Sequence, residues 1–123
     1  MLSINYRDSR PIYEQIADSL REQIAKKLLM PDEKLPSVRE MAAEMSINPN
    51  TIQRAVRQLE QEGYVYTVAG RGTFVAQMDQ KESPRRKELL ERFDKLVEEL
   101  LVYQVEEAEL VEHIQRIQKG ETR

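Results

Sequence analysis

The chain has 123 residues, of which 40% are hydrophobic and 33% charged, a composition typical of one folded domain with at most a small appendage. It contains no cysteine and a single histidine, His113, which excludes disulfides, thiolate nucleophiles and zinc sites built on Cys or several His. No apolar run is long enough to span a membrane and no signal-peptide pattern opens the chain, so we expect a cytoplasmic protein.

The formal net charge is −3, which by itself argues against a nucleic-acid partner, because such domains are usually basic. The charge is distributed unevenly, however. Residues 1–77 contain ten basic and ten acidic side chains, whereas residues 78–123 contain nine and twelve. Residues 48–59 contain two arginines and no acid. Because phosphate contacts depend on local charge, DNA binding is compatible with this balance, although an acidic remainder weakens non-specific binding.

Two helices are predicted in the first third of the chain, after an extended arm at residues 1–10. Pro11 fits the first position of a helix over residues 11–27, since its missing N–H has no partner there. Pro31-Asp32 indicates a turn. Ser37 and Glu40 match a capping box that begins a short helix at 38–45. For the core we expect four side chains in particular: Tyr13, Met41, Met45 and Phe74.

A third helix has two opposite faces. Asn48 is its expected cap, Pro49 its first residue and Gly63 its left-handed end. Ile52, Ala55, Val56 and Leu59 form an apolar stripe, and Asn50, Gln53, Arg54 and Arg57 form a polar stripe with the same spacing. At about 100° per residue the two stripes lie about 200° apart. Asn, Gln and Arg make bidentate contacts with base edges in the major groove, so this helix is typical of a DNA reader.

Two short β-type runs follow, Tyr64–Val68 and Thr73–Ala76, joined by the turn Ala69-Gly70-Arg71-Gly72. Three helices and a hairpin predict a mostly α fold with a small β wing, the winged helix-turn-helix, in which the second helix of the turn enters the major groove. We assign residues 1–77 to this DNA-binding domain and 78–84 to a polar linker. We assign residues 85–123 to a helical tail. No Gly or Pro separates its apolar stripes, so one long helix is possible, but we favour a break near Tyr103–Glu107 that gives a helical hairpin.

The tail carries apolar stripes that it cannot bury alone, because isolated units below about 40 residues rarely enclose a core. Exposed stripes of this size indicate an interface, and a two-fold dimer joins identical patches. Such a dimer can place two reading helices about 34 Å apart on a palindromic site. The alternative is that the tail folds back on its own winged helix. The expected dimerisation residues are Leu89, Phe93, Leu96, Val97, Leu100, Leu101, Leu110, Val111, Ile114 and Ile117.

Several blocks in the right order resemble the amino-terminal domain of GntR-family bacterial transcription regulators, over about residues 3–78. The short two-helix tail is similar to that of the YtrA-type subfamily, in which the tail serves as a dimerisation module. The blocks are Pro11-Ile12-Tyr13-Glu14-Gln15-Ile16, Leu35-Pro36-Ser37-Val38-Arg39-Glu40, Asn50-Thr51 with Arg54-Ala55, Leu59-Glu60-Gln61-Glu62-Gly63-Tyr64 and Gly70-Arg71-Gly72-Thr73-Phe74-Val75.

The resemblance implies a repressor that binds a palindromic operator as a homodimer. It implies phosphate or base contacts by Arg39 and by the start of the third helix, and an approach of the wing tip to the minor groove, where arginine suits the negative potential. The resulting DNA-binding set is Ser37, Arg39, Asn48, Asn50, Thr51, Gln53, Arg54, Arg57, Gly70 and Arg71. Lys27 and Asp32 stand where many members have glycine, and Pro49 where some have a DNA-contacting arginine.

Two other classes of function remain open. A winged-helix protein-interaction adaptor fits the acidic balance, but arginines on the proposed DNA side argue against it. An enzyme is disfavoured, since no nucleophile–base pair, metal set or cofactor loop is evident. The acids of the tail lie on polar faces, and Arg39 could instead pair with Glu40 or Glu44. We therefore expect double-stranded DNA as partner, with no cofactor, no metal and no membrane; the sequence does not identify an effector.

Overall fold

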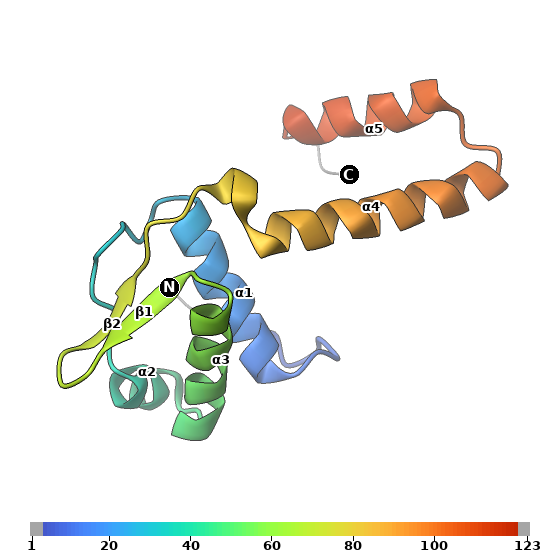
Figure 1. Ribbon diagram of the computed structural model, residues 1–123. Helices are drawn as coiled ribbons and strands as arrows, with labels where there is room; N and C mark the ends of the chain where they lie inside the picture. The colour runs from blue at the N-terminus through green and yellow to red at the C-terminus, as the bar shows by residue number, and fades with distance from the viewer. Residues whose placement is uncertain (1–3, 121–123) are drawn as a thin grey trace. The chain divides into compact units, whose positions relative to one another are not determined.

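The computed structural model describes residues 4–120 and divides after Ser83 into two compact units. The first unit contains α1 (Ile12–Ala25), α2 (Val38–Met45), α3 (Pro49–Gln61), strands β1 (Val65–Val68) and β2 (Gly72–Val75) and the short 3₁₀ helix η1 (Gln80–Glu82) (Figure 1). The second contains α4 (Pro84–Val102) and α5 (Glu107–Gln118). The predicted fold, a winged helix-turn-helix followed by a two-helix tail, is confirmed.

The helix ends follow the predicted capping rules. The Ser37 hydroxyl oxygen accepts the Glu40 N–H at 3.0 Å, and the Asn48 side chain accepts the Asn50 N–H at 2.8 Å. Pro49 occupies the first position of α3. Beyond the other end of that helix, Gly63 has φ +85°, the left-handed conformation that favours glycine. These local signals place α3 where it was predicted.

The core of the first unit lies between α1 and α3 and extends to α2 and the hairpin. Ile16, Leu20, Ile52 and Leu59 from the two longer helices are buried, with Met41, Tyr64 and Val75 beside them. Of the four expected core residues, only Met41 is fully buried. Tyr13 and Met45 pack against the core but are only partly buried. Phe74 is not a core residue: it is partly exposed and stacks on Tyr66, with ring centroids 5.6 Å apart.

The predicted extended arm is wrong for residues 5–10, which form turns against α1. The Asp8 N–H donates to the Asn5 carbonyl at 3.1 Å. The buried Gln15 amide binds the same residue twice, accepting the Asn5 N–H at 2.9 Å and donating to its carbonyl at 3.1 Å. A polar side chain of α1 thus folds the arm back. The first three residues of the arm lie outside the described residues.

After the turn at Pro31-Asp32, residues 33–35 form a short extended segment beside β2, bridged at Lys34 and Phe74, in a stretch where the sequence suggested only a turn. The Asp32 N–H donates to the Val75 carbonyl at 2.7 Å, and the Val75 N–H donates to the Glu33 carbonyl at 2.9 Å. The Leu35 N–H donates to the Thr73 carbonyl at 2.8 Å. The side of β2 that faces away from β1 is therefore paired, and the wing is bound to the segment that leads into α2.

Lys27 and Asp32 both adopt positive φ, +59° and +67°. These are the two positions at which the resemblance to the GntR family called for glycine. Lys27 follows the end of α1, where the Leu28 N–H closes the helix on the Gln23 carbonyl at 2.8 Å. A left-handed conformation costs a residue with a Cβ roughly 1–2 kcal/mol, so the chain holds this turn against a local penalty.

Lys27→Gly is therefore expected to raise the free energy of unfolding by about 1 kcal/mol, because glycine relieves the left-handed strain at an exposed position. Chemical denaturation monitored by circular dichroism measures the change. The matched control is Lys26→Gly, one residue earlier with φ −82°, where glycine gains nothing and costs about 0.5–1 kcal/mol. Equal destabilisation by both variants would contradict the argument.

Residues 78–83, expected as part of a linker, belong to the first unit. The buried Tyr64 hydroxyl and the Ser83 hydroxyl are hydrogen-bonded at 2.5 Å. The Asp79 side chain caps η1 by accepting the Lys81 N–H at 2.9 Å. The boundary between the units thus falls at the start of α4, later than the predicted end of the DNA-binding domain at residue 77.

The second unit is a helical hairpin, as predicted from the break near Tyr103–Glu107. The Val105 N–H donates to the Leu100 carbonyl at 3.2 Å, and Gln104 takes φ +63°. None of the side chains in α4 and α5 is buried. The large apolar side chains that stay exposed include Leu89, Phe93, Leu96, Leu100, Leu101, Val111, Ile114 and Ile117. Val97 and Leu110 are half-buried. Across residues 4–120, no helix combines the length and apolarity needed to cross a bilayer.

Candidate nucleic-acid interface

The two faces of α3 are separated as the spacing predicted. Ile52, Ala55, Val56 and Leu59 are at most 3% exposed. On the opposite stripe Asn50, Arg54 and Arg57 are exposed and Gln53 is half-buried. Thr51, at the start of the helix, is also half-buried. The apolar side of the helix therefore packs in the core, and its amide and guanidinium groups point outward.

The starts of α2 and α3 present donors after capping. The Asn48 side-chain oxygen is used by the Asn50 N–H, which leaves the Asn48 amide –NH₂ as a donor. The Ser37 hydroxyl oxygen accepts the Glu40 N–H, and its own hydrogen stays available. Helix starts also carry partial positive charge. Both starts are thus suited to phosphate oxygens.

Arg39 is exposed on α2, and in the part of the chain that the structure describes it forms no ion pair with Glu40 or Glu44. The competing interpretation, a surface ion pair, is therefore not what the structure shows. The Arg54 guanidinium carbon lies 3.8 Å from the centroid of the Tyr13 ring on α1. The sequence did not reveal this contact, since the two residues are far apart in the chain.

The tip of the wing depends on two glycines. Gly70 has φ +75° with open space around it, and the adjacent Arg71 is exposed. Gly72 has φ +122°, and a Cβ there would lie 2.8 Å from the Lys34 side chain. The Arg71 N–H closes the turn on the Val68 carbonyl at 2.9 Å. The backbone at Gly70 is thus free to approach a groove beside the Arg71 side chain.

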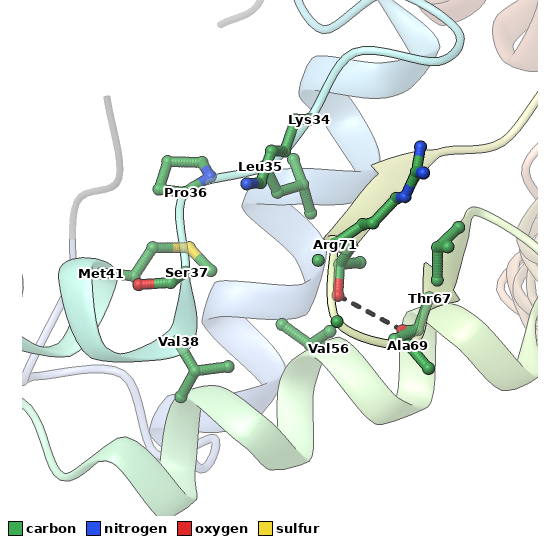
Figure 2. A pocket seen from close by; sticks show the side chains of 14 residues that line it. Lys34, Leu35, Pro36, Ser37, Val38, Met41, Val56, Thr67, Ala69 and Arg71 are labelled. Atoms are coloured by element: carbon green, nitrogen blue, oxygen red, sulfur yellow. Dashed lines mark hydrogen bonds between the residues drawn. The ribbon is translucent and has the colours of Figure 1, made fainter.

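A hollow of about 400 Å³ lies between the wing and the segment that leads into α2 (Figure 2). Val38, Met41 and Val56 line it, together with the wing residues Thr67, Ala69 and Arg71. Ser37 lines it as well, beside Met41. The hollow therefore brings Ser37 together with Gly70 and Arg71, predicted DNA-binding residues that follow it by more than 30 positions in the sequence.

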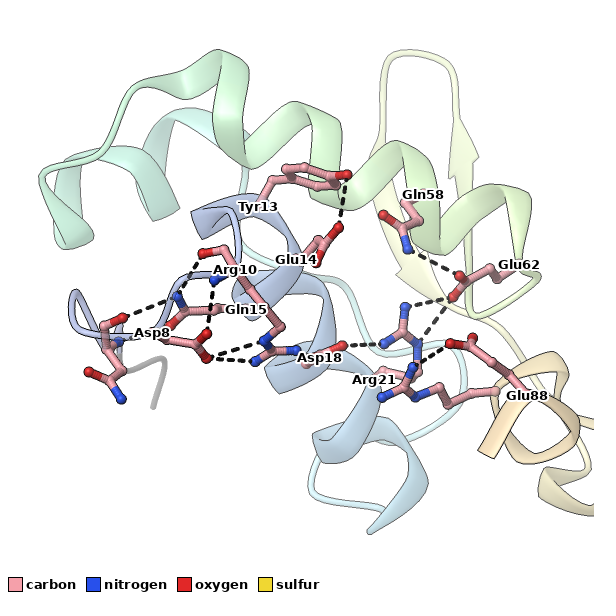
Figure 3. A network of polar contacts seen from close by, with 12 residues as sticks. Asp8, Arg10, Tyr13, Glu14, Gln15, Asp18, Arg21, Gln58, Glu62 and Glu88 are labelled. Carbon is pink, nitrogen blue, oxygen red and sulfur yellow. Dashed lines mark hydrogen bonds and ion pairs between the residues drawn. The ribbon is translucent and has the colours of Figure 1, made fainter. Parts of the chain in front are cut away.

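A polar network fixes α1 against the end of α3 (Figure 3). The buried Arg21 guanidinium donates to Glu62 Oε1 from Nε at 3.1 Å and from Nη2 at 2.9 Å, and to Asp18 Oδ1 at 2.7 Å. Asp18 also pairs with Arg10. Burial opposes ionisation of Asp18, but the hydrogen bonds from Arg10 and Arg21 outweigh it and lower the pKa of Asp18. No sequence pattern indicated Arg21.

This lowered pKa has a direct consequence for acid stability. Because the folded-state pKa of Asp18 lies below its ordinary value of 3.8, the carboxylate stabilises the fold at higher pH, and this contribution is lost as the pH falls through the folded value. We expect Asp18→Asn to lower the free energy of unfolding at pH 7 and to flatten its decline below about pH 4. Urea denaturation at a series of pH values measures both; parallel curves for variant and wild type would contradict the assignment.

A helix with an outward polar stripe, donor-rich helix starts and an arginine beside a glycine at the wing tip define a DNA-binding winged helix-turn-helix protein. Residues 12–75 match the model of the family described as "Bacterial regulatory proteins, gntR family". The chain is 44% identical over 99 residues to the uncharacterised HTH-type transcriptional regulator YhcF of Bacillus subtilis, covering 77% of this chain and 82% of that one. The chain belongs to the GntR family of transcription regulators, which are not enzymes.

Another relative is the HTH-type transcriptional repressor YtrA of Bacillus subtilis, 46% identical over 77 residues, which span 63% of this chain and 59% of that one. A transcriptional antiterminator structure from Listeria monocytogenes superposes with a TM-score of 0.79 at 32% identity, covering 100% of this chain and 93% of that one. The DNA-binding domain of AraR in complex with operator ORE1 gives 0.54 at 29% identity, covering 62% and 93%. The family and fold predicted from the sequence are thus confirmed.

Proposed function

We propose that this chain is a homodimeric repressor that binds a palindromic operator through α3 and the wing, in the bacterial cytoplasm. The proposed contacts are those of the predicted DNA-binding set, with Gln53, Arg54 and Arg57 directed at base edges and Ser37, Arg39, Asn48, Asn50 and Thr51 at phosphates or bases. Gly70 and Arg71 approach the minor groove. The similarity to the AraR domain, which is bound to an operator in its own structure, supports the proposal that this chain binds DNA.

One observation carries the proposal: the arginines of this set have no carboxylate partners within the described residues. Arg39, Arg54, Arg57 and Arg71 are exposed, and none of them forms an ion pair within residues 4–120. Two of the three other arginines of the same unit do: Arg10 pairs with Asp8 and Asp18, and Arg21 with Asp18 and Glu62, whereas Arg7 forms no ion pair with a described residue. Unpaired guanidinium groups at the reading helix and the wing tip are the groups that phosphate and guanine recognise.

The second unit supports the homodimer. Its apolar stripes stay exposed because the hairpin is too small to bury both, and contiguous exposed apolar surface of this kind marks an interface. A two-fold axis joins identical surfaces and relates two winged helices, which matches the symmetry of a palindromic site. Packing of the apolar stripes against the same stripes of a second copy would bury them without any further partner.

In vitro selection of duplexes from a random pool tests the function. We expect enrichment of one palindromic sequence, with half-sites about one helical turn apart. Affinity for that sequence is expected to fall by about 10³-fold or more between 50 and 200 mM salt, because each phosphate contact releases counterions.

Failure to enrich any sequence, or binding that is insensitive to salt, would favour the adaptor alternative, in which the winged helix binds protein. The acidic balance of the tail is the feature consistent with that alternative. A selected site without two-fold symmetry would keep DNA binding and reject the dimeric arrangement.

A further inference from the structure

Two arginines of the first unit lie over tyrosine rings, and their surroundings differ. The guanidinium carbon of Arg21 is 5.6 Å from the centroid of the Tyr64 ring, and that of Arg54 is 3.8 Å from the centroid of the Tyr13 ring. Both pairs join different elements: Arg21 and Tyr13 belong to α1, Arg54 to α3, and Tyr64 follows α3. The difference lies in what the remaining donors of each guanidinium do.

The donors of Arg21 are occupied. Its Nε and both Nη atoms donate to the Glu62 and Asp18 carboxylates, and the residue is 6% exposed. A guanidinium that is buried and paired with two carboxylates is not accessible to an external ligand. The Arg21–Tyr64 contact is therefore a structural connection between α1 and the end of α3.

The donors of Arg54 are not occupied. The residue is exposed, and within the described part of the chain its guanidinium forms no hydrogen bond and no ion pair. The guanidinium carbon lies over the face of the Tyr13 ring, 3.8 Å from its centroid. Because all five N–H groups lie in the plane of the guanidinium, stacking on its face leaves every one of them free for an acceptor at its edge.

The Tyr13 ring is itself held in place. It packs against the hydrophobic core, and its hydroxyl donates to Glu14 Oε1 at 3.3 Å (Figure 3). Tyr13 is on α1, outside the helix-turn-helix. A ring fixed by the core thus restricts the long side chain of a residue on the reading helix, which otherwise loses several rotatable bonds on binding.

We propose that Tyr13 is a positioning residue that aims the Arg54 guanidinium at one base pair of the operator and so sets the sequence preference there. The inference rests on the proposed function, since it assigns to α1 a part in DNA reading. Tyr13 touches no base. It acts by holding the Arg54 edge in the one orientation in which two parallel N–H groups meet the two acceptors of a guanine.

The test compares four variants of the full chain on the selected operator and on a series in which each base pair is changed in turn. Arg54→Ala is expected to lose about 5- to 150-fold of discrimination at one base pair. Tyr13→Leu is expected to lose discrimination at that same base pair and no other, while the salt dependence of binding stays at the wild-type slope. Tyr13→Phe keeps the ring and is expected to retain the preference.

Arg54→Lys tests the role of the planar guanidinium at an exposed position, where the substitution does not disturb the core. It keeps the charge but loses the planar fork, so the preference at that base pair is expected to disappear. Should Tyr13→Leu fold poorly by circular dichroism, Tyr13→Met replaces it, since methionine adapts to a partly buried site.

The outcomes separate this inference from the proposed function. A wild-type chain that selects no sequence rejects both. A wild-type chain that selects an operator, together with a Tyr13→Leu variant whose base preferences are unchanged or whose affinity falls equally on every sequence, leaves the proposed function standing and overturns the positioning role. In that case the Tyr13 contact only joins α1 to α3.

Discussion

Phe93→Glu combined with Leu100→Glu is expected to convert the proposed homodimer into monomers and to lower operator affinity by at least 100-fold. The two residues lie seven positions apart on the same side of α4 and are 45% and 39% exposed. Burying them against a second copy becomes unfavourable once each carries a charge without a partner. Affinity falls because the second half-site is no longer bound as part of the same molecule, and such linkage is worth about 10²- to 10⁴-fold.

Sedimentation velocity at micromolar concentration measures the first effect, and titration of the selected operator measures the second. Lys95→Glu is the matched control. It changes the net charge by the same two units, and it lies about 200° around α4 from Phe93. The control is expected to stay dimeric. A double variant that remains a dimer would place the interface elsewhere and reject the stripe of α4.

Arg21→Met is expected to lower the free energy of unfolding by about 2–3 kcal/mol, the largest effect we expect from a single substitution of a charged residue in this chain. Arg21 is buried, and its removal leaves the Glu62 and Asp18 carboxylates without their cation. Removing one partner of a fully buried ion pair costs about 3–5 kcal/mol. The Glu62 and Asp18 side chains are 26% and 29% exposed, so water solvates them in part and the expected cost is smaller. Methionine retains the packing volume along α1.

Equilibrium unfolding in urea gives the magnitude. Lys26→Met serves as the control on the same helix, because the Lys26–Glu22 pair is 63% exposed on both sides and such pairs contribute about 0–1 kcal/mol. If both variants lose the same small amount, the network around Arg21 does not stabilise the contact between α1 and α3. The acid dependence changes too: without Arg21, the pKa of Asp18 rises toward its ordinary value.

The parts of the fold predicted from the sequence are those that depend on neighbours in the chain. Ser37 and Asn48 cap their helices, Gly63 ends α3 and the break after Val102 divides the tail, because each uses hydrogen bonds within a few residues. The two faces of α3 follow from its own periodicity. The exposure of the predicted reading residues follows from the same pattern, whereas their contacts with DNA stay predictions.

What the sequence did not reveal depends on contacts between distant segments. The Arg54–Tyr13 and Arg21–Glu62 contacts each join residues 41 positions apart, and no local pattern encodes them. Pro31-Asp32 predicts only the turn that it forms, because the partner of the extended segment at residues 33–35 is a strand about 40 residues later. The prediction of Phe74 as a core residue is wrong, because this hairpin side chain stacks on its cross-strand neighbour Tyr66.

The pairing of residues 32–35 with β2 determines which pieces can be exchanged among relatives. A graft of the wing alone into another scaffold would leave the Val75 N–H without the Glu33 carbonyl and the Thr73 carbonyl without the Leu35 N–H. It would also leave the Gly72 backbone without the Lys34 side chain that lies over it. An exchangeable module therefore includes residues 32–75 without interruption, together with α1, which shares the core with α3. Hybrid regulators cut within that span are expected to fold less stably than hybrids cut after Val75.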